Sequence, residues 1–520
     1  MTESINFSGL GSGLDTKAII DALMSVEKKP LTKLENTKSN YEQQKTIYAD
    51  LKNKIQDLES AVSSMNAASE FKAMKATSSD TDIFTVSASG SANVGLHSIK
   101  VTQLAQTEIQ MTAAYGSKVT QIKQGSLVIG VEGEDNVTVN ITSANNALQG
   151  LVDAINASGA KVKASFVNVG TTSSPSWRVS VAATDTGKTV TLDTSGLTTG
   201  TGEVPSFTET QTQKKAIIDF DGLTNIEKTS NSITDLLDGV TITLKKPDPT
   251  NTDTVSIEPD VETMKKNINN FIDKYNAVIQ YINDKTTGDT LKNDTAFRSI
   301  KSELTSMVIS HVEGLTGDYK ALSQVGIKTD SSGKLSLNSS TFDNMAEDHF
   351  EDITKIFTSF GQPDNPYVEF ITNSAKTKAG NYSIELTGVG ANFAGTINGH
   401  PANVYGGSYL IGATGTPEEG LMVKVTGETV GSYGNLNFSV GAMDTFDRKL
   451  TSWLDPVSGL LKNQTTNIDS SISRLNNEID QKQTQLDKIE AKYKQQFAQL
   501  EASLSSMQTQ NAFISSALKS

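Results

Sequence analysis

The chain has 520 residues, a formal net charge of -14 and no cysteine. The acidic balance argues against a nucleic-acid-binding protein, because phosphate contacts need clustered Lys and Arg, and against attraction to an anionic membrane surface. Without cysteine the chain cannot form disulfides, cysteine-ligated metal sites or thiol nucleophiles. The length predicts about three or four domains.

No run of about 18 consecutive apolar residues is present, so membrane insertion is not expected. The first residues, MTESINFSGLGSGLDT, lack a basic segment followed by an apolar one. A Sec-type signal peptide is therefore not expected. The glycines in this stretch have no preceding strand, which argues against a phosphate-binding loop.

The N-terminal region is predicted to be helical. Asp15 is a suitable N-cap for a short helix that begins near Thr16, and Pro30 fits a break or the first turn of the next helix. A longer amphipathic helix follows, with apolar positions at Leu34, Tyr41, Tyr48, Leu51, Ile55, Leu58, Val62 and Met65.

After Phe71 the apolar pattern changes from helical to alternating, which predicts strands. Residues 83–87 and 97–101 are expected to form a hairpin around Gly90–Gly95. The Val- and Thr-rich sequence that follows predicts a β-domain, and strands resume near residue 216.

Within that β-domain one helix is predicted, at Ala144–Ala157. The tract Thr198–Thr212 is poor in large apolar residues and is interpreted as a linker. Helical patterns return after Val261, followed by a hairpin with its turn at Asp330–Gly333 and a helix at Ser340–Phe357.

Residues 361–444 hold 15 of the 39 glycines and several strand-like runs, so a second β-insertion is expected there. The last stretch, Leu460–Leu518, has neither Gly nor Pro. Its apolar residues recur in steps of three and four, which is typical of a coiled-coil seam. Lys482 and Asn511 occupy two polar seam positions and are interpreted as setting its register.

An apolar stripe of this length needs a cover, and the N-terminal helices are the expected partner. The predicted fold is therefore α+β, elongated and multi-domain, with paired N- and C-terminal coiled-coil helices forming a stalk and nested antiparallel β-domains inserted between them. The alternative is that each end forms a separate intermolecular coil.

Six parts follow from this pattern: residues 1–75, N-terminal leg helices; 76–114 with 214–258, a middle β-domain; 115–213, an inserted outer β-domain; 259–360, a helical domain; 361–444, the additional β-insertion; and 445–520, the C-terminal leg helix.

No motif for catalysis or metal binding stands out. The four histidines are scattered, and neither H-E-x-x-H nor G-x-S-x-G occurs. Neither a metal nor a cofactor is expected. A pair of carboxylates for glycoside cleavage stays open, since its spacing is spatial. Trp177 and Trp453 are the two tryptophans available to stack on a sugar, and Trp453 is expected to be core.

Several segments resemble one family in the expected order. The run INFSGLGSGLDTKAIIDALMSVEKKPLTKLE resembles the N-terminus of the flagellar filament cap proteins, also called the flagellar hook-associated protein 2 family. The runs KAIIDFDGLTNIEKTSNSITDLLDGVTITLKK, NINNFIDKYNAVIQYIND and LSQVGIKTDSSGKLSLN are similar to its middle region. The resemblance covers most of the chain except residues 361–444.

The resemblance implies a non-enzymatic protein that is exported unfolded through the flagellar type III apparatus and located extracellularly, at the distal filament tip of the bacterial flagellum. Such proteins form a ring of identical subunits, and their legs engage flagellin while it folds and inserts. Flagellin, hook–filament junction proteins and an export chaperone are the implied partners, with roles in motility and adhesion.

The residues expected to lie at protein interfaces are apolar or seam residues near the two chain ends: Phe7, Leu10, Leu14, Ile20, Leu23, Phe497, Leu500, Leu504, Met507, Asn511, Ile514 and Leu518. The outer ends of the legs are expected to be marginally stable alone and to order on contact with partners. Two other functions stay open: another axial protein, either flagellin or a junction protein, and a β-domain adhesin or glycan-acting enzyme.

Overall fold

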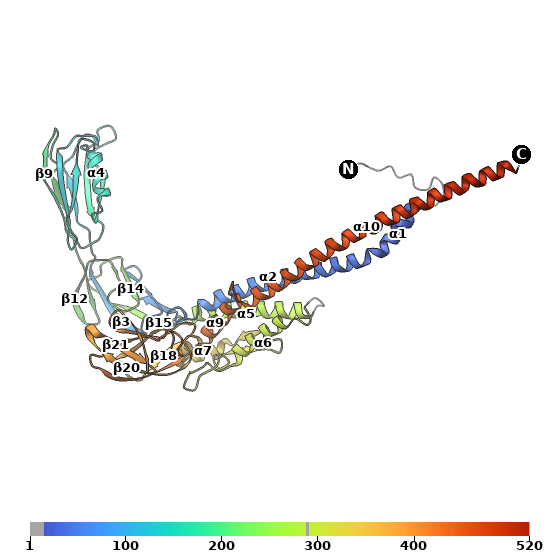
Figure 1. Ribbon diagram of the computed structural model, residues 1–520. Helices are drawn as coiled ribbons and strands as arrows, with labels where there is room; N and C mark the ends of the chain where they lie inside the picture. The colour runs from blue at the N-terminus through green and yellow to red at the C-terminus, as the bar shows by residue number, and fades with distance from the viewer. Residues whose placement is uncertain (1–14, 288–290, 519–520) are drawn as a thin grey trace. The chain divides into compact units, whose positions relative to one another are not determined.

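The chain forms two compact units in a computed structural model that describes residues 15–287 and 291–518 (Figure 1). The first unit combines residues 1–67 with 265–520, and the second spans residues 68–264. Terminal helices and antiparallel sheets inserted between them confirm the predicted α+β class.

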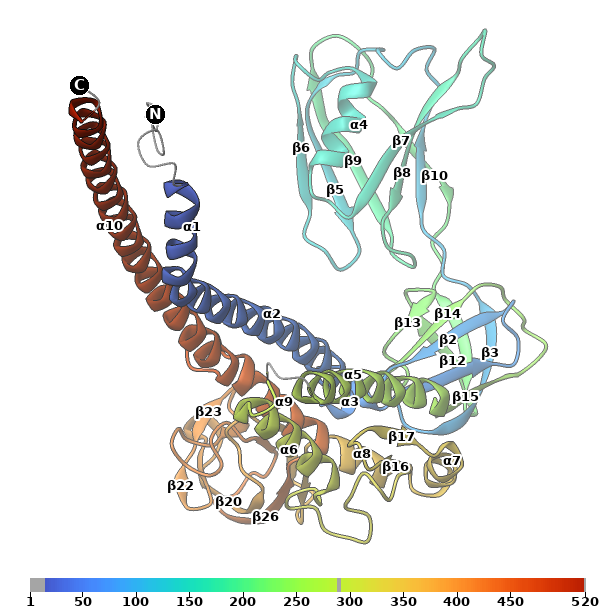
Figure 2. The same ribbon diagram turned by 90° about the vertical axis from the view of Figure 1, so that its right-hand side faces the viewer.

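The terminal helices of the first unit pair as predicted. α1 (Thr16–Glu27) and α2 (Lys29–Ser63) lie against α10 (Leu460–Ala517), as Figure 1 shows; Figure 2 shows the same helices turned by 90°. Asp15 caps α1 by accepting a hydrogen bond of 2.9 Å from the amide of Ala18. Pro30 lies in the first turn of α2, where its missing N–H costs no helical hydrogen bond.

Further helices contact the C-terminal half of α2: α5 (Val261–Thr287), α6 (Thr295–Ile309) and α9 (Ala442–Leu454). The predicted hairpin is present as β16 (Ile327–Thr329) and β17 (Leu335–Leu337).

The single helix predicted at Ser340–Phe357 is wrong. The chain forms α7 (Ser339–Asp348) and α8 (Phe350–Phe357), which are separated at His349. His349 has φ -138° and ψ 38°, outside the helical region, so the hydrogen-bond ladder ends there.

The β-insertion of the first unit is a two-sheet sandwich. Its strands are β18 (Phe360–Pro363), β19 (Val368–Thr372), β20 (Gly380–Gly388), β21 (Ala394–Ile397), β22 (His400–Pro401), β23 (Asn403–Tyr405), β24 (Tyr409–Ile411), β25 (Met422–Val425) and β26 (Gly431–Ser439). One sheet has the order β18-β26-β20-β21-β22 and the other β19-β25-β24-β23. Ile384, Leu386, Leu410, Val423 and Phe438, from both sheets, share its core.

The second unit contains a β-domain with the sheets β1-β15-β3-β11-β12 and β13-β14-β2. These strands are β1 (Met74–Ser78), β2 (Phe84–Ala88), β3 (Gly95–Gln103), β11 (Ala216–Phe220), β12 (Leu223–Lys228), β13 (Ser232–Ile233), β14 (Val240–Leu244) and β15 (Asp253–Pro259). The hairpin predicted around Gly90–Gly95 is wrong, because β2 pairs with β14 whereas β3 pairs with β15 and β11.

A further β-domain of the second unit has the sheets β10-β4-β8-β7 and β6-β5-β9, with α4 (Leu148–Ala157) against them. Its strands are β4 (Ile109–Thr112), β5 (Gln124–Val131), β6 (Val137–Ile141), β7 (Val162–Asn168), β8 (Trp177–Ala183), β9 (Val190–Thr199) and β10 (Phe207–Gln211). The helix begins four residues later than the predicted Ala144.

The interpretation of Thr198–Thr212 as a linker is wrong in part, because β10 pairs with β4. This strand lies at a sheet edge and has mostly exposed polar side chains, so it lacks the apolar alternation that predicts a strand. The six domain limits remain a proposal. Strand β4, which falls within the predicted range 76–114, pairs with β8 and β10 of the further β-domain.

Candidate assembly surface at the chain ends

The seam between α2 and α10 is built from the apolar positions of both helices. Leu51 of α2 is fully buried, and Ile468 and Leu475 of α10 are nearly so; the last turns of α2, with Ile55 and Leu58 fully buried, pack against α9 instead. The two helices run antiparallel, since Lys45 pairs with Asp469 at 2.6 Å while Leu31 lies in one cluster with Leu486. The apolar residues at a/d spacing in α10 therefore pack against helices of the same chain.

Polar contacts hold the C-terminal half of α2 to the neighbouring helices. The Tyr48 hydroxyl donates to the Asp294 carboxylate at 2.7 Å, and its ring meets Phe297 edge-on at 5.2 Å. Burial, and then the bond to Asp294, raises the pKa of Tyr48 well above its usual range. Lys274 also pairs with Asp57 at 3.2 Å. This half of α2 is thus fixed on several sides.

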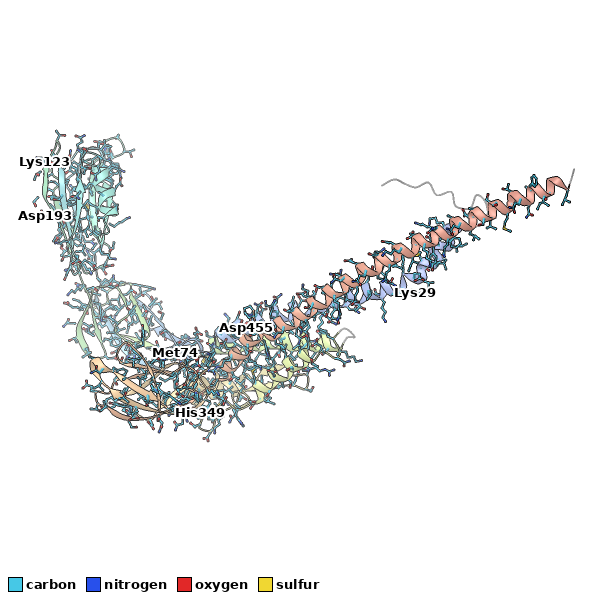
Figure 3. The ribbon with its side chains drawn as sticks, in the orientation of Figure 1. Lys29, Met74, Lys123, Asp193, His349 and Asp455 are labelled. Carbon is cyan, nitrogen blue, oxygen red and sulfur yellow. The ribbon has the colours of Figure 1, made fainter. Side chains whose placement is uncertain are left out.

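Burial along α10 decreases towards its C-terminus. Leu486 is 1% exposed, whereas Leu500 is 45%, Met507 59% and Leu518 82% exposed. α10 has 58 residues, while the helices that cover it have 12 and 35. Among the described residues, no second helix lies beside the part of α10 that extends beyond α1 (Figure 3). Residues 500–518 are called the exposed C-terminal segment below.

The predicted interface residues fall into four groups. Phe7, Leu10 and Leu14 lie outside the described residues. Ile20 is buried in the intrachain seam and Phe497 packs half-buried against it. Leu23 is exposed on α1. The structure places the others, Leu500, Leu504, Met507, Asn511, Ile514 and Leu518, on the exposed C-terminal segment, where Leu504 is half-buried.

Three apolar residues of the same region were not predicted. Phe513 is 73% exposed, and Ile19 and Val26 are exposed on α1. Phe513 falls between the seam steps at Asn511 and Ile514, so the a/d pattern gives no reason to select it. Its aromatic character and its position in the last turns of the helix were the available signals.

Two of the histidines are hydrogen-bonded to carboxylates. His97 bonds Asp221 at 2.7 Å and His400 bonds Glu418 at 2.6 Å. Within the described ranges no group of three or more His, Cys, Asp or Glu residues could hold a metal ion. In the same ranges every helix is too short or too polar to cross a bilayer.

The two tryptophans differ in their surroundings. Trp453 is buried, as predicted for a core residue. The ring of Trp177 carries the Lys118 ammonium at 4.1 Å from its centroid. A cation in this position competes with a sugar for that face of the ring.

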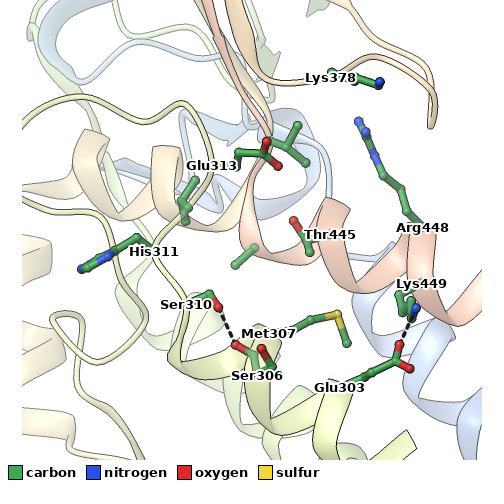
Figure 4. A pocket seen from close by; sticks show the side chains of 13 residues that line it. Glu303, Ser306, Met307, Ser310, His311, Glu313, Lys378, Thr445, Arg448 and Lys449 are labelled. Carbon is green, nitrogen blue, oxygen red and sulfur yellow. Dashed lines mark hydrogen bonds and ion pairs between the residues drawn. The ribbon is translucent and has the colours of Figure 1, made fainter. Parts of the chain in front are cut away.

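A hollow of about 700 Å³ lies in the first unit between α6 and α9 (Figure 4). Glu303 pairs with Lys449 across it. Arg448 bonds Asp444 at 2.8 Å and the carbonyls of Ser374 and Thr377, which fixes the β-insertion to α9. These charged groups of α6 and α9 are thus engaged in structural contacts.

The fold and this surface define a class of protein: an assembly protein whose two ends pair as helices and whose C-terminal helix presents apolar side chains beyond that pairing. Comparisons with known proteins are specific about the family. A sequence profile for the flagellar hook-associated protein 2 C-terminus matches residues 213–509, and one for the N-terminus of the same protein matches residues 12–108.

The chain is 27% identical to flagellar hook-associated protein 2 of Escherichia coli strain K12, over 98% of this chain and 97% of that protein. It is 28% identical to A-type flagellar hook-associated protein 2 of Pseudomonas aeruginosa, over 69% of this chain and 81% of that protein. The crystal structure of the D1-D2-D3 domains of the E. coli flagellar cap protein FliD shares the fold, with a TM-score of 0.56 and 23% sequence identity. The match covers 81% of this chain and 99% of that structure.

The chain belongs to the flagellar hook-associated protein 2 family. The resemblance noted in the sequence is therefore confirmed.

Proposed function

We propose that this protein caps the distal end of the bacterial flagellar filament. Family membership supports this role, and the observation that carries it is the apolar C-terminal segment, where Met507, Phe513 and Leu518 are each more than half exposed. Side chains of this kind at a helix end are suited to contacts with other subunits.

In this proposal the exposed C-terminal segment contacts flagellin and neighbouring copies, and the copies form a ring that promotes flagellin folding and insertion. Leu23, Phe497 and Leu500 would extend the contact towards α1. Hook–filament junction proteins and an export chaperone are the other proposed partners. The role requires no catalysis, cofactor or membrane insertion.

Complementation tests the role directly. Cells that lack their own cap protein and release flagellin into the medium should regain filaments when they express this chain. Flagellin or a junction protein would not restore filaments, so continued release of flagellin would contradict the proposal. Turnover of a glycan panel, abolished by one carboxylate substitution, would instead establish an enzyme.

A further inference from the structure

The sheet β19-β25-β24-β23 of the β-insertion has one buried and one outward face. Val404, Leu410 and Val423 are paired across neighbouring strands and therefore share a face, and Leu410 and Val423 are fully buried. Side chains alternate along a strand. Their neighbours in each strand consequently lie on the opposite face, called the outer face below.

Two cross-strand rows make up the outer face. The first row is Glu369, Lys424, Tyr409 and Tyr405. The second is Met422, Ile411 and Asn403, together with Thr372, which pairs with Met422 after a β-bulge that follows Phe370. Tyr405 is 67% exposed, and its ring centroid lies 6.2 Å from that of Tyr409. Lys424 and Glu369 approach to 3.8 Å and cancel each other's charge.

The other sheet of the same sandwich provides an internal comparison. Its outward positions carry small or polar side chains: Asn381, Ser383, Glu385, Ser432 and Asn435. That is the usual composition of a solvated sheet face. Tyrosine, methionine and isoleucine with no net charge resemble instead the centre of a protein–protein interface.

The charge of the whole chain favours a particular occupant. Each copy carries a formal charge of -14, so the net electrostatic force between two copies is repulsive. The outer face has no net charge, because its Lys and Glu form a pair. It is therefore a surface on which a second acidic copy can dock without like-charge contact.

We propose that the outer face is buried against a second copy of this chain when the protein self-associates. The inference rests on the proposed function in that it requires self-association, and it assigns a specific surface to that contact. Tyr405 and Tyr409 supply the buried aromatic area, and their hydroxyl groups can donate to the partner's backbone.

Because the chain has no cysteine, a single introduced thiol reports burial of this face. The full-length N403C variant places it on the outer face, and the S432C variant places a matched control on the outward face of the other sheet. Maleimide labelling is followed over increasing protein concentration while light scattering gives the mass. The labelling rate of N403C should fall at least about tenfold as the mass rises, since interface centres exclude water. The S432C rate should not change.

A charge exchange tests the electrostatic argument. K424E places two carboxylates side by side and should weaken self-association at least about tenfold. The double variant E369K/K424E restores the pair in reverse order and should recover association. Circular dichroism of each variant checks that the sandwich is folded.

Three results would overturn the inference. If mass rises while N403C stays as reactive as in the monomer, the outer face is not the contact, although the proposed function stands. If protection requires added flagellin or polysaccharide, the occupant is not a second copy. If no variant or wild-type chain associates at any concentration, self-association itself fails.

Discussion

Tyr48 links α2 to the start of α6 through a hydroxyl–carboxylate hydrogen bond of 2.7 Å to Asp294. Its side chain is 2% exposed, so the lost bond cannot be fully replaced by water. Tyr48→Phe should lower the free energy of unfolding of this helical region by about 1.5–3 kcal/mol, the usual range for bonds to charged groups. Tyr41→Phe, on the same helix, is the control and should change it by less than about 0.5 kcal/mol.

Because the pKa of the Tyr48 hydroxyl is raised in the folded chain, we also expect stability to fall at alkaline pH. Burial and the Asp294 carboxylate raise its pKa in the folded chain, whereas the unfolded chain releases the proton near about pH 10. Above that pH the unfolded state binds fewer protons, so stability falls as pH rises; below it the contribution is complete. In urea titrations from pH 8 to 11, the Tyr48→Phe variant should lose less stability than the wild type. Equal losses would contradict the assignment.

Gly90 shows why one local structure could not be predicted. Its position between two strand-like runs indicates a hairpin turn, but its φ is not positive. A Cβ there would lie 2.3 Å from the carbonyl oxygen of Ser69 and 2.6 Å from that of Lys72. The glycine permits close approach of two backbone segments, a long-range requirement that no local pattern reports. By contrast, Gly333 has φ 92° in the hairpin turn that was predicted correctly.

At the scale of single elements, the sequence predicts the helix α10 well. It does not predict which part of the apolar stripe of α10 is covered by other helices. The a/d spacing and the absence of Gly and Pro define a long helix. The point at which burial ends depends on where α1 begins and on the register of the pairing, which the Lys45–Asp469 ion pair and the cluster of Leu31 with Leu486 fix. The sequence therefore predicts the stripe but not which part of it stays exposed.

Two leucines of α10 should respond differently to truncation. Leu486 is 1% exposed and packs against α1 and α2, whereas Leu500 is 45% exposed. Leu486→Ala should reduce the local opening free energy by about 2–5 kcal/mol. Leu500→Ala should change it by less than about 0.5 kcal/mol in the monomer. Amide exchange across residues 480–495 measures both, and equal effects would contradict the burial of Leu486 in the seam.

At the scale of the molecule, we expect the C-terminal end of α10 to depend on partners more than the domains do. Residues 500–517 are the helical end of α10 and carry exposed apolar side chains. Isolated helical ends are marginal because ordering each residue costs about 1–2 kcal/mol. Amide exchange over this segment should be fast in a dilute monomer and slow in the assembled protein. Slow exchange across Leu500–Leu518 in the monomer would argue against a segment that is stabilised by assembly.

Asn511 tests whether assembly through that segment depends on register. It lies exposed at a seam position, between Met507 and Ile514. A polar residue at such a position costs affinity and selects one alignment of the helices. Asn511→Leu should therefore strengthen association, broaden the distribution of assembled masses and reduce filament recovery in cap-deficient cells. Ser505→Leu adds the same side chain away from the seam and should leave the mass distribution unchanged. If Asn511→Leu assembles and complements like the wild type, Asn511 does not set the register, and the apolar side chains alone determine the contact.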